Sequence, residues 1–220
     1  MRSNLLLIFI FLFAFQGRGF AGFLSGDASP YVSGGGSQAY RLTSSIIMLK
    51  TPFSSIDLSY KIGLNDKYNF YLKAGVGTID YSTVTDYKLT IDPVINGLGL
   101  EYLYFENTDT KEKQYFFTEY ETVAWSVNKK SNSSVNVAIG FAFSSFTGEN
   151  LRTTYRLSAQ NFYAGQESEE NIASSVKYSL STDVAFTFSG NYCANIEGGI
   201  YLGDPGGMIS YFGLGIGFNT

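Results

Sequence analysis

The sequence predicts an all-β protein: a closed antiparallel up-and-down transmembrane β-barrel of about ten strands, with eight strands as the alternative. Three observations lead to this fold class. Apolar residues recur at every second position over most of the chain, charged residues make up only 15% of it, and aromatic residues make up 17% of its 220 residues. Ordinary soluble domains carry charges on about a quarter of their residues. The composition therefore favours a protein whose surface meets lipid.

The first 21 residues have the parts of a secretory signal peptide. Arg2 precedes an apolar run from Leu5 to Phe15, and Ala21 is a small residue at which cleavage is expected. The apolar run is too short for a membrane-spanning helix, which needs about 20 residues. Residues 22–39 are rich in Gly and Ser and predict a flexible segment, so the barrel is expected over residues 40–220.

The alternation of apolar and polar residues identifies the strands. In the segment 55–64, Ile56 and Leu58 fall on one face while Asp57 and Lys61 fall on the other. Segments of this kind have the length of tilted membrane strands, about nine to thirteen residues. Ten segments are expected in order along the chain: 40–49, 55–64, 70–77, 97–104, 114–127, 135–144, 152–161, 176–188, 195–202 and 211–218.

The segment 114–127 departs from a simple alternation. Glu119 and Glu121 have the same parity as Phe117 and Val123. Charged and apolar side chains would then share one face of the strand. We therefore expect a β-bulge or a change of register in this segment.

The period alone does not say which face of the barrel points inward, because a soluble barrel has the same period with the faces exchanged. A soluble barrel would expose the glycine-rich face to water and pack many Phe, Tyr and Leu side chains into a narrow lumen. We therefore expect the apolar face to contact lipid. The residues predicted to face lipid are Phe70, Leu72, Phe141, Phe143, Phe186, Phe188, Phe212, Leu214, Ile216 and Phe218. Aromatic residues near strand ends are expected to form interfacial girdles.

Charged residues of both signs fall on the opposite face, in the lumen. They are Asp57, Lys61, Lys73, Glu101, Arg156, Asp183 and Glu197. Charges inside a low-dielectric wall must pair with one another or be hydrated. Small barrels have little free space inside, which favours a plug of ion pairs, with a hydrated pore as the alternative.

The segments between the strands divide into short turns and longer loops. With the N-terminus in the periplasm, short turns are expected there at 65–67, 147–150 and 189–191, and a longer one at 106–113. The outer loops are expected at 80–92, 128–134, 163–173 and 203–207.

The signal segment, the alternating strands and the run Gly-Leu-Gly-Ile-Gly-Phe at 213–218 together resemble small bacterial outer-membrane β-barrel proteins of the opacity-protein, OmpX and OmpW kind. The resemblance covers residues 40–220. It implies the bacterial outer membrane as location, with membrane lipid and the barrel-assembly machinery as partners. The families include adhesins, small channels and structural anchors, so the resemblance implies a fold more than an activity.

Enzyme chemistry has little support in this chain. It contains no His, the usual general base and the commonest metal ligand. The pairs Ser126 with Lys129 and Ser174 with Lys177 match a short serine–lysine pattern, but residues three apart in a strand point to opposite faces. We expect no catalytic residue, cofactor or metal site. Removal of the signal peptide leaves 13 basic and 19 acidic residues, which argues against nucleic acid as a partner.

Two functions fit these observations. The first is a non-enzymatic outer-membrane barrel with a charge-plugged lumen, whose surface loops contact extracellular ligands. The second is a narrow diffusion pore for ions or small solutes. A soluble periplasmic carrier is a third class, and it would leave the membrane on carbonate or urea extraction.

Overall fold

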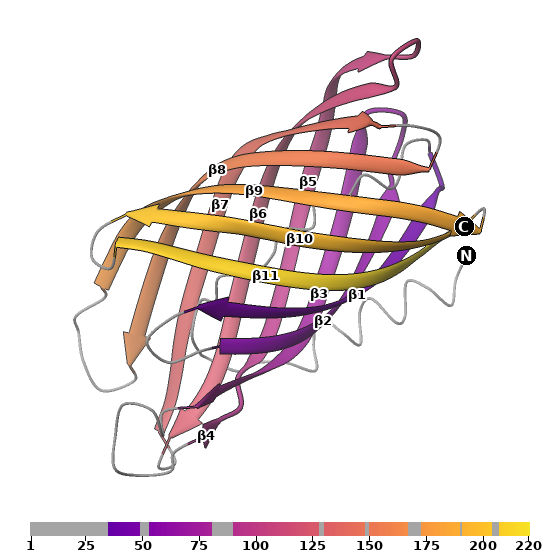
Figure 1. The fold of residues 1–220 in the computed structure, drawn as a ribbon. Helices are drawn as coiled ribbons and strands as arrows, with labels where there is room; N and C mark the ends of the chain where they lie inside the picture. Colours follow the sequence, from indigo (N-terminus) through magenta and orange to yellow (C-terminus); the bar gives the residue numbers. More distant parts are fainter. Residues whose placement is uncertain are drawn as a thin grey trace.

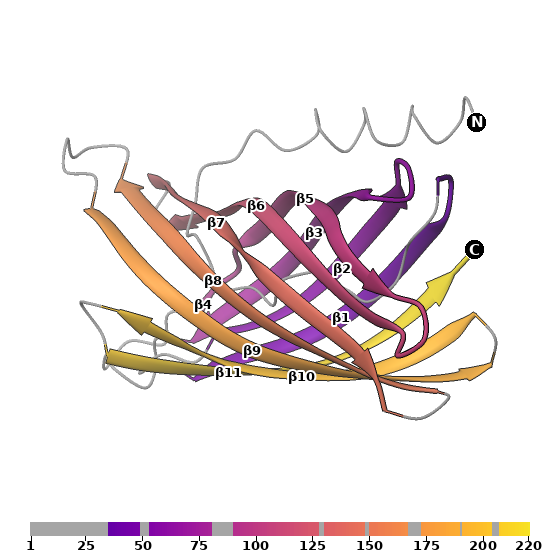
Figure 2. The same cartoon turned by 90° about the horizontal axis from the view of Figure 1, so that it is seen from above.

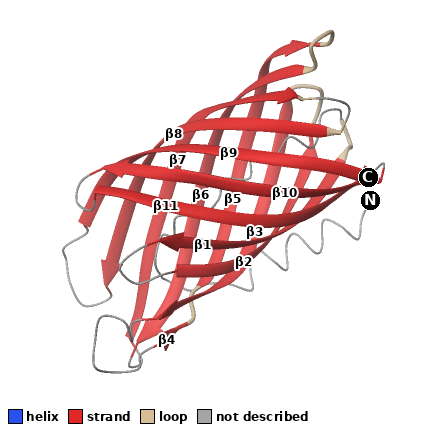
Figure 3. Ribbon diagram, viewed as in Figure 1, coloured by secondary structure: helices blue, strands red, loops and turns tan. Residues whose placement is uncertain are grey.

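The computed structural model of the chain describes residues 35–48, 53–80, 90–127, 130–147, 150–166, 173–189, 191–203 and 207–220. These residues form a closed antiparallel barrel of ten long strands, as the sequence predicted (Figure 1). Strands and the segments that connect them make up the whole described part (Figure 3). Within the described ranges, no helix has the length and apolar character needed to cross a membrane.

The ten long strands are β1 (Gln38–Met48), β2 (Phe53–Gly63), β3 (Tyr68–Asp80), β5 (Val94–Asn107), β6 (Glu112–Val127), β7 (Lys130–Phe146), β8 (Leu151–Gln166), β9 (Ala173–Ser189), β10 (Tyr192–Gly203) and β11 (Gly207–Asn219). The short strand β4 (Thr90–Ile91) pairs with the end of β3. Each long strand otherwise pairs with its neighbours along the chain.

Pairing of the first and last strands closes the barrel. β1 runs antiparallel to β11 from the pair Ala39–Asn219 to the pair Met48–Ser210. The dark purple β1 therefore lies beside the yellow β11 in Figure 1, and Figure 2 shows the strands of the wall around the interior from a second direction. Closure leaves no strand edge unpaired, which a sheet within lipid requires.

The wall has an inner and an outer face that alternate residue by residue. In β2, Asp57 is 1% exposed and the next residue, Leu58, is 48% exposed. The same alternation of buried and exposed positions runs through the whole of β2. It follows from the strand geometry, in which successive side chains point to opposite faces.

The bulge or register change expected from Glu119 and Glu121 in β6 is not found at these residues. The pairing of this strand with β7 is unbroken from Lys113 to Val127, and Phe117, Glu119 and Glu121 are all buried on the inner face. Aromatic and acidic side chains can share this face because the lumen of a ten-stranded barrel is filled by side chains of both kinds.

The irregularity lies in the neighbouring strand instead. The register between β5 and β6 shifts between Leu103 and Phe105. Tyr104 and Phe105 are both exposed as a result, although they are adjacent in sequence. One residue of β5 is thus left over, as in a β-bulge.

Several strands are longer than the sequence predicted. β1 begins at Gln38, within the segment expected to be flexible, and β7 begins at Lys130, so the expected loop 128–134 is wrong over 130–134. β8 and β9 likewise shorten the expected loop 163–173 to 167–172. These strand ends are polar, so the alternation of apolar residues does not reveal that the strands continue through them.

The turn between β5 and β6 is also shorter than expected. It spans only 108–111, and the Asn107 side chain accepts hydrogen bonds from the backbone N–H groups of Asp109 and Thr110 at 3.0 and 3.3 Å. The turn between β2 and β3 is built in the same way around Asn65, which accepts from the N–H groups of Lys67 and Tyr68. An Asn side chain that replaces a backbone acceptor is a common device in tight turns.

Some sequence predictions lie outside the described residues. They are the signal peptide 1–21, residues 22–34 of the segment that follows it, and most of the expected outer loops, at 81–89, 128–129, 167–172 and 204–206. Residues 148–149 and 190, in two of the expected periplasmic turns, also lie outside.

The two ends of the barrel are named here by their connections. The turn side contains the first residues of β1, the last residues of β11 and the tight turns. The loop side is the opposite end.

Candidate functional site: the barrel interior

The seven charged residues that the sequence placed in the lumen are all buried on the inner face of the wall. They are Asp57, Lys61, Lys73, Glu101, Arg156, Asp183 and Glu197, and none is more than 6% exposed. Sequence reasoning left five further buried charged residues out of this set: Arg41, Glu119, Glu121, Arg152 and Lys177. The twelve side chains comprise six basic and six acidic groups, so the buried charge of the described residues sums to zero.

Arg41 on β1 contacts two carboxylates at hydrogen-bond distance. Its Nη2 lies 2.9 Å from Asp183 Oδ2 on β9 and 2.9 Å from Glu197 Oε2 on β10. Asn195 also donates to Asp183 at 2.9 Å, and the Tyr211 hydroxyl donates to Glu197 at 2.8 Å. We call Arg41, Asp183 and Glu197 the closure group, because they connect the first strand to two of the last three.

The closure group crosses β11 where the inner face of that strand carries glycine. Gly215 pairs with Thr43 on one side and with Asn195 on the other. A Cβ at Gly215 would collide with the Asn195 side chain and lie 3.1 Å from the Leu42 carbonyl oxygen. Glycine here leaves room for polar side chains of neighbouring strands to meet over β11.

A second ion pair joins β2 to β5. Lys61 Nζ lies 2.6 Å from Glu101 Oε1, and Asn69 donates to the other carboxylate oxygen at 3.1 Å. The Lys61 ammonium also lies 5.3 Å from the centre of the Tyr71 ring, within the range of a cation–π interaction. The strand between the two charges, β3, thus contributes both an amide and an aromatic ring to the pair.

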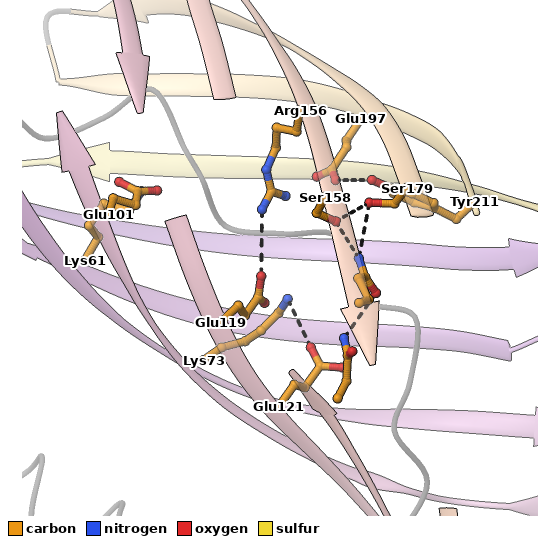
Figure 4. Close-up of polar contacts among 12 residues, drawn as sticks. Lys61, Lys73, Glu101, Glu119, Glu121, Arg156, Ser158, Ser179, Glu197 and Tyr211 are labelled. Atoms are coloured by element: carbon orange, nitrogen blue, oxygen red, sulfur yellow. Dashed lines mark hydrogen bonds and ion pairs between the residues drawn. The ribbon is translucent and has the colours of Figure 1, made fainter. Parts of the chain in front are cut away.

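A third ion pair crosses β5 at a glycine. Lys73 pairs in register with Gly97, and Gly97 pairs in register with Glu121. Above this glycine the Lys73 ammonium and a Glu121 carboxylate oxygen lie 3.8 Å apart (Figure 4). The missing side chain allows charges on second-neighbour strands to approach each other.

A fourth pair joins β8 to β6 in the same manner. Arg156 Nη2 lies 3.7 Å from Glu119 Oε2, and the two side chains point toward each other in Figure 4. The Arg156 guanidinium also lies 4.5 Å from the centre of the Phe117 ring. Gly140 occupies the strand between them, where a Cβ would lie 2.7 Å from the Phe117 ring.

Asp57 and Arg152 take other partners. Ser55 donates a hydrogen bond to Asp57 at 3.0 Å and shares a second one with Ser45 at 2.7 Å. Arg152 Nε donates to the Ser144 hydroxyl at 2.5 Å, and its guanidinium lies 5.2 Å from the centre of the Phe146 ring. Hydroxyl groups thus line much of the wall between the ion pairs.

Apolar side chains from strands other than β7, β8 and β9 pack together toward the loop side of the lumen. A buried cluster lies beyond the ion pairs and includes residues of β1 to β6, β10 and β11: Ile47, Phe53, Ile79, Ile91, Ile95, Val123, Tyr201, Ile209 and Tyr211, with Trp125 packed against it. We call it the apolar layer. A smaller cluster of Leu103, Tyr115, Phe117 and Ala142 lies toward the turn side on β5, β6 and β7.

The alternation of inward and outward positions in the sequence could have identified most of the buried charged residues that were missed. Arg41 has the parity of Thr43 and Ser45, and Lys177 has the parity of Ser179. Glu119 and Glu121 were noticed but attributed to a bulge. The apolar layer was not foreseen, because apolar residues at inward positions were assumed to contact lipid.

The outer wall holds the ten residues that were predicted to face lipid. Phe141, Phe186, Phe188, Phe212, Leu214 and Ile216 are exposed, and Phe70, Leu72, Phe143 and Phe218 are half-buried. Aromatic side chains gather toward its turn side, where ring centres lie 4.3 to 6.3 Å apart. This girdle consists of Tyr40, Tyr60, Tyr68, Tyr102, Tyr104, Phe116, Phe141, Phe188, Tyr192 and Phe218.

No group of three or more His, Cys, Asp or Glu side chains in the described ranges has the geometry of a metal site. Ser174 and Lys177 both lie in the continuous strand β9. Lys129, of the other serine–lysine pair, lies outside the described residues.

Comparison with known proteins gives likenesses of fold. No protein-family model matches the sequence, and no curated protein matches it significantly. Solved structures of outer-membrane barrels do match the structure. The N-terminal β-barrel domain of OprF from Pseudomonas aeruginosa is 14% identical, with a TM-score of 0.38, over 86% of this chain and 100% of that domain.

Two further matches have similar extents. The attachment invasion locus protein Ail of Yersinia pestis is 13% identical with a TM-score of 0.40, over 86% of this chain and 100% of Ail. The outer membrane protease OmpT of Escherichia coli is 7% identical with a TM-score of 0.44, over 89% of this chain and 100% of OmpT. At such low identities these likenesses concern the fold alone. The resemblance to small outer-membrane β-barrels that the sequence suggested is confirmed at that level, since the chain itself forms a closed antiparallel barrel.

Proposed function

We propose that this chain is a non-enzymatic protein of the bacterial outer membrane whose lumen is closed to ions and whose outer loops contact ligands outside the cell. Export through the signal peptide at 1–21 and insertion by the barrel-assembly machinery belong to the proposal. The observation that carries it is the pairing of charges inside a barrel whose exposed face is apolar.

The outer wall supports a location in lipid. Exposed side chains at mid-strand are large and apolar, such as Ile139 at 61%, Leu157 at 56% and Leu180 at 51% exposure. A continuous apolar surface on this scale would make a soluble monomer aggregate. Aromatic rings at the turn side are suited to the level of the lipid headgroups.

The interior supports a lumen that is closed to ions. A permeating ion would have to pass the closure group and the pairs Lys73–Glu121 and Arg156–Glu119, each of which holds charges of both signs on the inner wall. It would also meet the apolar layer, where loss of its hydration shell is not compensated. Ion passage therefore requires the plug to rearrange.

The surface role rests on the loop side. The strands β8 and β9 are among the longest, at 16 and 17 residues, and the chain between them, at 167–172, joins their loop-side ends. Residues 81–89 join β3 to β4 at the same end. Segments held at the rim of a rigid barrel are suited to contacts with extracellular molecules.

Planar-bilayer recording tests the closed lumen. The purified protein is expected to give no reproducible single-channel steps, whereas a variant with Arg41→Ala and Lys73→Ala is expected to give them, because it removes two long cationic side chains from the lumen. The variant shows that the recording can detect an opened barrel. Reproducible steps from the unaltered protein would replace the plugged lumen by a narrow diffusion pore.

Extraction and gel mobility test the membrane location. The protein should stay with membranes in carbonate and in urea, and unboiled samples should migrate differently from boiled ones in detergent gels. Release into the soluble fraction would favour a periplasmic carrier instead. Protease treatment of intact cells, with cleavage expected at 81–89 or 167–172, tests which end of the barrel faces outward.

A further inference from the structure

The inner face of β7, β8 and β9 differs from the rest of the lumen. Its buried residues toward the loop side are mainly polar, with Ala138 among them and Lys177 at the loop-side end of β9, and the apolar layer includes no described residue of these three strands. We call this strip the polar seam; it consists of Ser134, Asn136, Ser158, Gln160, Ser179 and Ser181.

The seam residues form a chain of hydrogen bonds across the three strands. Asn136 donates to the Gln160 side chain at 3.2 Å, and Gln160 donates to Ser158 and Ser179 at 3.1 and 3.2 Å. The hydroxyls of Ser158 and Ser179 lie 2.6 Å apart, and Figure 4 shows both beside the ion pairs. These four side chains are therefore held in place, and none of them carries a charge.

Three buried polar atoms, one in the seam and two in the ion pairs beside it, lack hydrogen-bond partners in the described protein. Asn136 Oδ1, Arg156 Nε and Asp183 Oδ1 are buried and have no hydrogen-bond partner within the described protein, and they lie one on each of the three strands. Buried polar atoms in native proteins are nearly always hydrogen-bonded, to water where no protein group is available. Their positions indicate water along this wall.

The seam continues toward the turn side. Below Arg156, β8 presents Thr154 and Arg152, both of which contact the Ser144 hydroxyl of β7. The smaller apolar cluster extends onto these three strands only through Ala142. The inner face of β7 to β9 therefore carries mainly polar and small side chains, whereas bulky ones such as Phe53, Tyr201 and Tyr211 lie on β2, β10 and β11.

We propose that the polar seam holds water and lets water and small uncharged hydroxyl compounds of the size of glycerol cross the barrel, while ions do not cross. The proposal rests on the closed lumen proposed above and adds a route within it. Serine hydroxyls and side-chain amides can form hydrogen bonds in place of those between such a solute and water. The solute therefore loses little free energy when it enters the seam. An ion loses much more of its hydration and meets the fixed Arg156–Glu119 pair beside the seam.

Swelling of proteoliposomes in glycerol tests the route. Vesicles with the unaltered protein should swell faster than protein-free vesicles, and Ser179→Leu, which fills the seam, should reduce the rate to that of protein-free vesicles. Ser45→Leu is the matched control, because Ser45 also shares a buried hydroxyl contact with a serine of the next strand, at 2.7 Å, on the opposite wall. Its rate should equal that of the unaltered protein.

Thiol accessibility gives a second readout that a folding defect does not mimic. In a Cys193→Ala background, Ser179→Cys should react in the folded barrel with a small, uncharged, water-soluble thiol reagent, and Ser45→Cys should not. Equal reactivity of the two positions, or swelling no faster than in protein-free vesicles, would overturn the route. Ion conductance together with swelling would instead contradict the closed lumen, so the two proposals fail separately.

Discussion

The closure group and the Lys73–Glu121 pair both neutralise buried charges inside the barrel, but they do so with different geometry. In the first, one guanidinium lies 2.9 Å from each of two carboxylates, which also accept hydrogen bonds from Asn195 and Tyr211. In the second, one ammonium lies 3.8 Å from one carboxylate oxygen, above Gly97. Arginine can reach two partners because its planar fork has several donors, whereas lysine acts as a point charge.

The difference indicates how each group supports the barrel. Pairing at hydrogen-bond distance stabilises buried charges more than attraction at a longer distance, because it replaces the bonds to water that were lost. The closure group also connects strands that meet only when the barrel closes. We therefore expect stability to depend on it more than on the pair above Gly97.

Replacement of Arg41 should have the largest effect. Arg41→Met leaves two buried carboxylates close together without their cation, and it should lower the free energy of unfolding by about 3–5 kcal/mol. Urea unfolding in lipid vesicles, followed by the change in gel mobility, measures the loss. Arg41→Lys should recover part of it. Equal unfolding midpoints for Arg41→Met and the unaltered protein would remove the closure group's special role.

Replacement of Lys73 should cost less. Lys73→Met leaves a single carboxylate, Glu121, and we expect a loss of roughly 2 kcal/mol. The same unfolding measurement applies. Combining Lys73→Met with Glu121→Gln should cost less than the two separate losses added together. Strict additivity would mean that the pair at 3.8 Å contributes nothing.

The glycine beneath this pair allows a finer test. A Cβ at Gly97 would lie 3.4 Å from the Tyr120 carbonyl oxygen and 3.5 Å from Lys73 Cβ, which is near ordinary contact. Gly97→Ala should therefore be tolerated, while Gly97→Leu should displace the Lys73 side chain and cost about 1–3 kcal/mol. Unfolding midpoints of the two variants measure the contrast. If both variants unfold alike, the room above Gly97 has no role in the pair.

An ion pair outside the lumen should have the smallest effect. Lys113 Nζ lies 2.8 Å from Glu106 Oε1 near the β5–β6 turn, where the Glu106 side chain is 39% exposed. Glu106→Gln should change the free energy of unfolding by about 0–1 kcal/mol, less at high salt, because water screens the pair. A loss as large as that from Lys73→Met would show that burial is not what separates these pairs.

The alternation in sequence predicted the fold class and the inner position of the charges because it is a local property of strands. Asp57 and Glu197 could be placed from their immediate neighbours alone. Their partners could not, because pairing depends on the register between strands that are distant in sequence, such as β1 and β10. Arg41 and Glu197, for example, are 156 residues apart.

The expectation of a bulge at Glu119 and Glu121 in β6 has a different cause. An apolar residue at an inward position was taken as a break in the pattern, although Phe117 packs beneath the Arg156 guanidinium and Val123 belongs to the apolar layer. A lumen of this width holds rings and aliphatic side chains as well as charges. Apolar residues at inward positions are thus normal in this lumen, and their presence does not indicate a change of register.

The pairing of β1 with β11 has a consequence for how the barrel forms. Arg41 meets Asp183 and Glu197 only after 142 and 156 residues of intervening chain have been arranged. Contacts between such distant residues are slow to form, because the entropy of closing the loop is lost before they contribute. Hairpins such as β2–β3 can assemble early from neighbouring residues. We therefore expect the closure group to form in the last step and to oppose the first separation of the wall when the barrel begins to unfold.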